Sequence, residues 1–151
     1  MERSKIRRGV NGDTNFYTTD LSRSWVVGDA HPVLSELKQR LVKAQRLMID
    51  LVKPVLGFNE LFSIGFNYVK EKYKFYERGH LEHSISMGPQ TVETPFISLI
   101  EKRKLEASMI LCIETPCYIS GFGGFNIKDM ILVTEDGCEV LTPLTPHYNN
   151  I

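Results

Sequence analysis

Two charged residues lie beside apolar runs near the C-terminal end of the chain. Glu114 follows the apolar run 110–113, and Lys128 lies between Ile127 and the apolar run 130–133. An ionised carboxylate in an apolar strand is costly unless it is paired or coordinated to a cation. A lysine in such surroundings needs a carboxylate partner, which Asp20 or Glu114 would supply. The sequence therefore indicates a buried polar site that contains both signs of charge.

Histidine and aspartate side chains elsewhere in the chain could join this site. His80 and His83 form an HxxH pair, and Asp20 directly follows Tyr17-Thr18-Thr19. Taken alone, an HxxH pair is more often found at the surface than at a metal. A single aspartate after threonines equally fits a turn or a strand end. These residue types permit a metal site but do not by themselves require one.

Three segments in a fixed order add to this interpretation. The segments are residues 17–24 (YTTDLSRS), 79–86 (GHLEHSIS) and 109–142. The last of them includes IETP, a Gly-Gly hairpin and IKDMILVTEDG. They resemble the metal-site strands of the creatinase, prolidase and aminopeptidase P family, the "pita-bread" metallohydrolases. The corresponding family patterns are Gly-Tyr-x-Ser-Asp-x-Thr-Arg-Thr, Gly-His-x-Gly-His-x-Ile-Gly, and an Ile-Glu-Pro strand followed by an Ile-Glu-Asp strand. The resemblance spans Tyr17 to Thr142.

The resemblance implies roles for five residues of this chain. Asp20, His83 and Glu114 take the positions of metal ligands. His80 takes a substrate-binding position. Glu93, in the run Val-Glu-Thr-Pro, takes the position of a general base or acid.

Other positions depart from the family pattern. The family places a second aspartate 11 residues before Asp20, where this chain has Gly9, and a bridging glutamate where it has Lys128. Val92 stands where a histidine would donate a hydrogen bond to the developing oxyanion. Glu82 and Ser86 replace two glycines, so their side chains are expected to crowd the pocket.

These departures change the charge that a metal centre would require. Two divalent ions need several carboxylates to offset their mutual repulsion while they activate a bridging water. Relative to the family pattern, Gly9 and Lys128 move the local charge three units toward positive. One unit charge at about 4 Å is worth roughly 4 kcal/mol at an effective dielectric near 20. Two alternatives remain: one divalent metal (Mn, Co, Fe or Zn), or no metal, with the Lys128 ammonium beside Asp20 and Glu114. We favour the second.

Two functions from different classes follow. In the first, the chain is a metal-dependent peptidase of the Xaa-Pro dipeptidase or aminopeptidase type, with an impaired or mononuclear site and a peptide or small amide as substrate. In the second, it is a catalytically inactive relative or fragment that acts as a binding or assembly domain. The family resemblance points to the first function, which is the expectation here, whereas Gly9, Val92 and Lys128 favour the second, which is its alternative.

The pattern of apolar residues predicts the elements that position these side chains. Residues 5–28 are expected to form short strands punctuated by Gly9, Gly12 and Gly28. One helix is predicted over 32–52 and a second over 59–76 with Asn59 as its cap. Strands are predicted over 83–87 and from 109 onward, with a loop over 88–95 and a further apolar stretch over 96–100. The expected fold class is α+β: a curved, mostly antiparallel sheet with two helices on one face, as in a half or truncated pita-bread fold.

Length and composition limit the remaining possibilities. The 151 residues carry no formal net charge and are 42% hydrophobic, which fits one globular domain over 1–151 and gives no argument for nucleic acid or a membrane surface. Three cysteines without a CxxC pair are expected to be reduced thiols in a cytoplasmic protein. The domain is expected to lack the first structural half of the family fold. An uncovered sheet edge would then require a homo-oligomer or a partner chain.

Overall fold

The computed structural model describes residues 5–14, 17–26, 29, 31–85 and 93–142. It contains two helices and nine strands within those residues. In chain order the elements are β1 (Lys5–Thr14), β2 (Tyr17–Val26), α1 (Pro32–Ile49), α2 (Phe58–Lys72), β3 (His80–Ile85), β4 (Glu93–Ser98), β5 (Ile110–Glu114), β6 (Cys117–Ile119), β7 (Gly123–Phe125), β8 (Lys128–Val133) and β9 (Cys138–Val140).

The N-terminal strands form one long hairpin. β1 and β2 pair antiparallel along their whole length, from Lys5 opposite Val26 to Thr14 opposite Tyr17. The prediction of several short strands was therefore wrong. Gly9 and Gly12 lie inside β1 and do not end it. A glycine within a strand weakens the pairing but does not prevent it.

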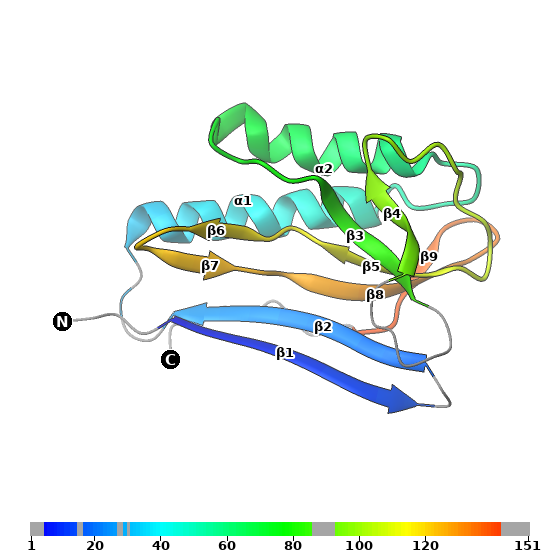
Figure 1. The fold of residues 1–151 in the computed structure, drawn as a ribbon, viewed down its shortest axis with the longest axis horizontal. Helices are drawn as coiled ribbons and strands as arrows, with labels where there is room; N and C mark the ends of the chain where they lie inside the picture. Colours follow the sequence, from blue (N-terminus) through cyan, green and yellow to red (C-terminus); the bar gives the residue numbers. More distant parts are fainter. Residues whose placement is uncertain (1–4, 15–16, 27–28, 30, 86–92, 143–151) are drawn as a thin grey trace.

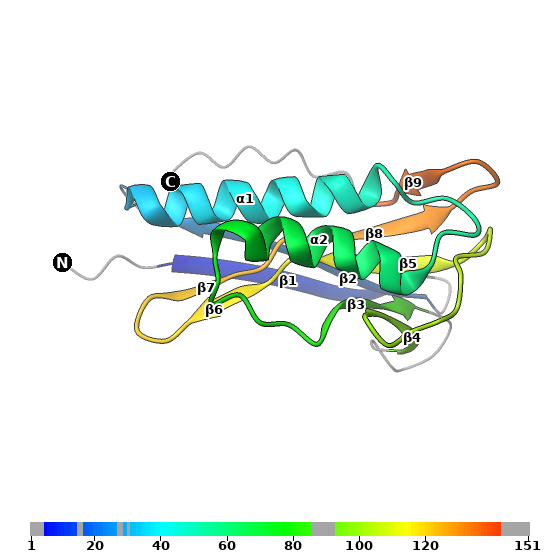
Figure 2. The same ribbon diagram turned by 90° about the horizontal axis from the view of Figure 1, so that it is seen from above.

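Seven strands make the main sheet, in the order β1-β2-β8-β5-β3-β4 with β9 added beside β8, and every pairing is antiparallel. β6 and β7 pair with each other as a separate two-stranded hairpin. Both helices lie on the same side of the sheet, as Figure 1 shows, and they run side by side across it in Figure 2. The predicted α+β class with two helices on one face is confirmed.

Both helices differ in their bounds from the prediction. α1 ends at Ile49 rather than Val52, and α2 runs over Phe58–Lys72 rather than 59–76. The cap of α2 is Gly57, not Asn59, because the Glu60 carboxylate accepts a hydrogen bond from the Gly57 N–H at 3.0 Å. The strand predicted over 83–87 corresponds to β3, which begins at His80; residues 86 and 87 lie outside the described residues. The loop predicted over 88–95 was wrong at its end, because β4 begins at Glu93 and includes part of the apolar stretch 96–100.

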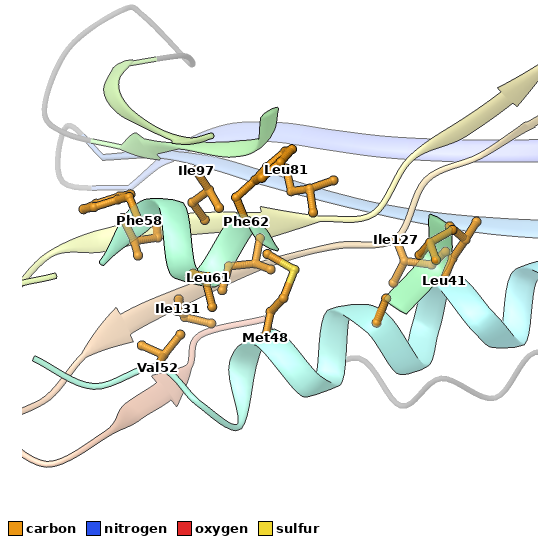
Figure 3. Close-up of a cluster of buried hydrophobic side chains, with 14 of the residues drawn as sticks. Leu41, Met48, Val52, Phe58, Leu61, Phe62, Leu81, Ile97, Ile127 and Ile131 are labelled. Carbon is orange, nitrogen blue, oxygen red and sulfur yellow. The ribbon is translucent and has the colours of Figure 1, made fainter. Parts of the chain in front are cut away.

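The main core lies between the helices and the sheet. Leu37, Leu41, Ala44 and Met48 recur at helical spacing and are buried, so α1 presents one apolar face to the sheet. Figure 3 shows Leu41 and Met48 of α1 and Leu61 and Phe62 of α2 near strand residues that include Leu81, Ile97 and Ile131. This packing fixes the strands that carry the charged residues.

A smaller apolar cluster is formed by Ile85, Cys112 and Met130, with Ile110 packed against it. Leu111 and Ile131 belong to the core under the helices, and side chains alternate along a strand, so Cys112 and Met130 lie on the opposite face of the sheet. We call this opposite side the second face of the sheet. No helix among the described residues is long and apolar enough to cross a membrane.

Candidate functional site

Four strands bring the predicted site residues together on the second face of the sheet. Lys128 at the start of β8 lies opposite Glu114 of β5 and opposite Ser22 of β2. Residues directly opposite each other share a face, as do residues two apart on one strand. Asp20, two residues before Ser22, therefore lies on the same face as Lys128 and Glu114. β3 supplies the remaining residues.

The ammonium of Lys128 lies at the centre of this group. Its Nζ donates a hydrogen bond to Asp20 Oδ2 at 2.7 Å and lies 2.7 Å from Glu82 Oε2. A third carboxylate oxygen, Glu114 Oε2, is 3.6 Å away. The side chain of Lys128 is only 10% exposed, so these three carboxylates replace the water that would otherwise solvate it. The predicted pairing of Lys128 with Asp20 and Glu114 agrees with this geometry.

Glu82 and His83 reach the same group of charged side chains although they are consecutive residues of one strand. Successive side chains of a regular strand point to opposite faces. The register of β3 against β4 shifts on both sides of His83, and Glu82 has φ +129°. These irregularities break the alternation. His83 Nε2 consequently lies 2.8 Å from Glu82 Oε2 and 3.3 Å from Asp20 Oδ2.

Glu114 is held from its other side by two polar residues. Asn126 Nδ2 donates a hydrogen bond to Glu114 Oε2 at 2.7 Å, and Arg78 Nη2 lies 3.6 Å from Glu114 Oε1. The group defined by Asp20, Glu82, Glu114, His83, Lys128 and Arg78 is called the charged cluster below. It contains three carboxylates and three side chains that can carry positive charge.

The carboxylates favour the protonated form of His83. Burial by itself lowers the pKa of the imidazole, but Asp20 and Glu82 more than offset it and raise the pKa of His83 to about 9. The pKa of Asp20 is lowered although burial raises it, because His83 and Lys128 stabilise the carboxylate. At neutral pH, His83 is therefore an imidazolium between carboxylates, and a protonated imidazole has no lone pair for a metal.

Glu82 and Glu114 behave as a coupled pair. Burial raises the pKa of Glu114, and its contact with Glu82 raises it further. Burial opposes ionisation of Glu82 as well, yet His83, Glu114 and Lys128 lower the pKa of that residue. Lys128 stays charged, because its neighbouring carboxylates raise its pKa despite burial. The carboxyl groups of Glu82 and Glu114 share a proton, which is why the pKa of Glu114 is raised while that of Glu82 is lowered.

The other predicted site residues lie around the cluster. His80 begins β3; its half-buried ring packs 5.6 Å from Phe96, and burial lowers its pKa. Glu93 begins β4 and pairs with Ser84, next to His83 in the chain. Position 9 lies on the same face as Asp20, because Asn11 pairs with Asp20 and Gly9 is two residues away. Val92 lies outside the described residues. The roles assigned to His80 and Glu93 stay predictions.

Sequence reasoning missed three members of the site: Glu82, Arg78 and Asn126. Glu82 was expected only to crowd the pocket, whereas it is 2% exposed and contacts both His83 and Lys128. A carboxylate next to a histidine within HxxH was the available signal. Its importance depends on the irregular backbone of β3, which the sequence does not reveal.

The donor set was compared with the needs of a divalent cation. Ligand atoms of Asp20, Glu82, His83 and Cys112 lie within 4.8 Å of one another. Burial raises the pKa of the Cys112 thiol, so this residue is a neutral donor, and its Sγ donates to the Asp20 carbonyl at 3.3 Å. An ion on Asp20 and Glu82 would lie close to the Lys128 ammonium, where each unit of charge costs roughly 4 kcal/mol at about 4 Å and a dielectric near 20. The residues therefore do not fit a divalent ion while Lys128 is charged and in place.

Comparison with known proteins places this site in a family context. Residues 8–135 match metallopeptidase family M24. The Xaa-Pro dipeptidase of Pyrococcus furiosus is 32% identical over 132 residues, which are 85% of this chain and 36% of that protein. A similar match at 32% identity covers 83% of this chain and 36% of the Xaa-Pro dipeptidase of Pyrococcus horikoshii.

Solved structures agree with the sequence comparison. The prolidase from Pyrococcus furiosus superposes with a TM-score of 0.86 at 30% identity and covers 93% of this chain and 41% of that one. The prolidase from Pyrococcus horikoshii has a TM-score of 0.89 at 28% identity, over 96% of this chain and 42% of that one. The fold is therefore a truncated pita-bread fold, and the chain spans about 36% of the length of the curated relatives described above.

Proposed function

Because the chain belongs to metallopeptidase family M24, we propose that it is a non-hydrolytic member of that family in which a lysine ammonium takes the place of the metal. Such a domain would act by binding or assembly. The observation that carries the proposal is the position of Lys128 Nζ, 2.7 Å from both Asp20 Oδ2 and Glu82 Oε2.

The chemistry of peptide hydrolysis supports this proposal. Peptide hydrolysis near neutral pH needs a nucleophile stronger than free water, and a bound metal can generate one by lowering the pKa of its water. In this chain Asp20 and Glu82 are engaged by Lys128 and His83, and Glu114 is engaged by Asn126. Glycine at position 9 contributes no further carboxylate. Carboxylates neutralised in this way have little remaining attraction for a divalent ion.

A second candidate function is a single-metal Xaa-Pro peptidase. The convergence of Asp20, Glu82, His83 and Cys112 favours it, and so do the names of the Pyrococcus relatives. The metal would be one Mn, Co, Fe or Zn ion, the substrate a peptide or small amide, and Glu93 the general base or acid. This function requires the Lys128 ammonium to leave Asp20 and Glu82, which is why we rank it second.

A peptidase assay separates the two functions. The purified chain is incubated with Xaa-Pro dipeptides and Mn²⁺, Co²⁺ or Zn²⁺, and the full-length Xaa-Pro dipeptidase of Pyrococcus furiosus is run under the same conditions as a positive control. We expect no metal-dependent release of proline from this chain. Release that a chelator abolishes and that His83→Ala also abolishes would establish the second function instead.

The binding or assembly role would use the edge of the sheet at β1, which pairs with β2 alone among the described strands. β1 is an edge strand of ten residues, and an edge of that length can pair with another chain. We propose a second copy or a partner chain there, with a cytoplasmic location that suits three free cysteines. Light scattering tests the first part: a strictly monomeric chain at high concentration would rule out self-association.

A further inference from the structure

Glu82 and Lys128 are the two members of the charged cluster that depart from the family pattern, and they contact each other. The pattern has a glycine at the first position and a glutamate at the second. Here the Lys128 Nζ to Glu82 Oε2 distance is 2.7 Å, and both side chains are buried, at 10% and 3% exposure. The two positions that differ in charge from the pattern therefore lie side by side.

We infer that Glu82 and Lys128 act as one unit, an internal ion pair without which neither residue could be buried in the charged cluster. This inference rests on the proposed function, since it explains how the site is stabilised without a metal. It assigns Glu82 a role that was not expected from the sequence.

The balance of charge supports the inference. With both residues present, Asp20, Glu82 and Glu114 face Lys128, His83 and Arg78. Removing only Lys128 leaves three carboxyl groups around one imidazolium and one guanidinium. Removing only Glu82 leaves Lys128 and His83 sharing the carboxylate of Asp20, with Glu114 at 3.6 Å as the other carboxyl group near Lys128. Removing both restores equal numbers of positive and negative groups, so the two changes together should cost less than their sum.

The backbone at Glu82 provides a second, independent observation. Its φ of +129° is a conformation that glycine adopts freely and that other residues adopt at a cost. A glutamate persists in such a conformation only where the surrounding structure holds it there, and contacts of its side chain contribute to that. The Glu82 carboxylate is within 2.8 Å of His83 Nε2 and 2.7 Å of Lys128 Nζ, and these are the contacts available to do so.

A double-mutant cycle tests the inference. The full chain, Glu82→Gln, Lys128→Met and the double variant are unfolded in urea, all in the same concentration of a stabilising osmolyte so that each starts folded. We expect each single change to shift the unfolding equilibrium toward the unfolded state. The double variant should be at least about tenfold more folded than the product of the single effects predicts, a coupling of about 1.4 kcal/mol.

A matched surface pair serves as the control. Glu36→Gln and Lys72→Met remove an exposed ion pair that joins the two helices, and their effects should simply add. Additive effects at Glu82 and Lys128 as well would overturn the inference. That result would leave the proposed function untouched, because peptide hydrolysis and metal binding by the unaltered chain test the proposed function separately.

Discussion

At the scale of single residues, the chemistry of the site depends on whether its carboxylates bind a metal ion or the ammonium of a lysine. A lysine ammonium is a point charge with three donors, and Lys128 directs that charge at Asp20 and Glu82, 2.7 Å away. His83 adds a second positive group to the same two carboxylates. These side chains, whose types could also bind a metal, thus form a buried ion-pair network.

This network predicts how stability depends on pH. The pKa of His83 is raised to about 9, so its contribution to stability is complete below its unfolded value of 6.5 and is lost as pH rises through about 9. Glu114 has a raised pKa as well, so its contribution also decreases as pH rises. We expect the melting temperature to fall by roughly 5 °C or more between pH 6.5 and 9.5.

Histidine variants assign that decrease to its source. In His83→Gln the fall in melting temperature over this pH range should be clearly smaller than in the unaltered chain. His31→Asn keeps a capping side chain at the start of α1, where the His31 ring accepts from the Val33 N–H, and should leave the pH dependence unchanged. A melting temperature that rises toward pH 9.5, or equal profiles for the unaltered chain and His83→Gln, would contradict the assignment.

At the scale of elements, the site depends on how β2 is held against β8. The two strands share a single paired position in the sheet, Ser22 with Lys128. Arg23 adds side-chain contacts: it donates to the Lys128 carbonyl and forms an ion pair with Asp129. Asp129 also accepts a hydrogen bond from the Thr142 hydroxyl at 3.0 Å. These contacts lie on the helix side of the sheet, directly behind the charged cluster.

Removing Arg23 should therefore weaken the whole arrangement. Arg23 is 4% exposed, and Arg23→Met would leave Asp129 without its cationic partner. Breaking a buried pair in this way costs about 3 kcal/mol or more in the free energy of unfolding, measured by urea denaturation. Arg103→Met removes an exposed guanidinium that pairs with Glu101 and should not shift the urea midpoint. Equal midpoints for the two variants would show that Arg23 does not hold β2 in place.

At the scale of the whole molecule, the sequence was sufficient for the fold class, since the apolar spacing of α1 predicted the first helix. The ordered series of strand motifs pointed to Asp20, His83, Glu114 and Lys128, which lie in one cluster, while their predicted roles stay predictions. Local signals failed where tertiary contacts decide the outcome. Gly9 and Gly12 suggested breaks, yet pairing with β2 keeps β1 continuous.

The position of Glu82 could not be predicted for a related reason. Strand alternation places neighbours on opposite faces, and only the irregular register of β3, with the positive φ of Glu82, turns this side chain toward Lys128. Arg78 likewise forms an ion pair with Glu114 although it lies between α2 and β3, outside the described strands. Neither contact leaves a periodic pattern in the sequence.

The measurement that tests the central claim most directly is the metal content of the unaltered chain and of Lys128→Glu. Both are dialysed against Mn²⁺, Co²⁺ or Zn²⁺, exchanged into metal-free buffer and analysed for bound metal. We predict no retained ion in the unaltered chain and about one ion per chain in Lys128→Glu, where a carboxylate replaces the ammonium. About one ion per unaltered chain would contradict the claim that the ammonium takes the place of the metal. Retention by neither protein would contradict the claim that Lys128 is what closes the site.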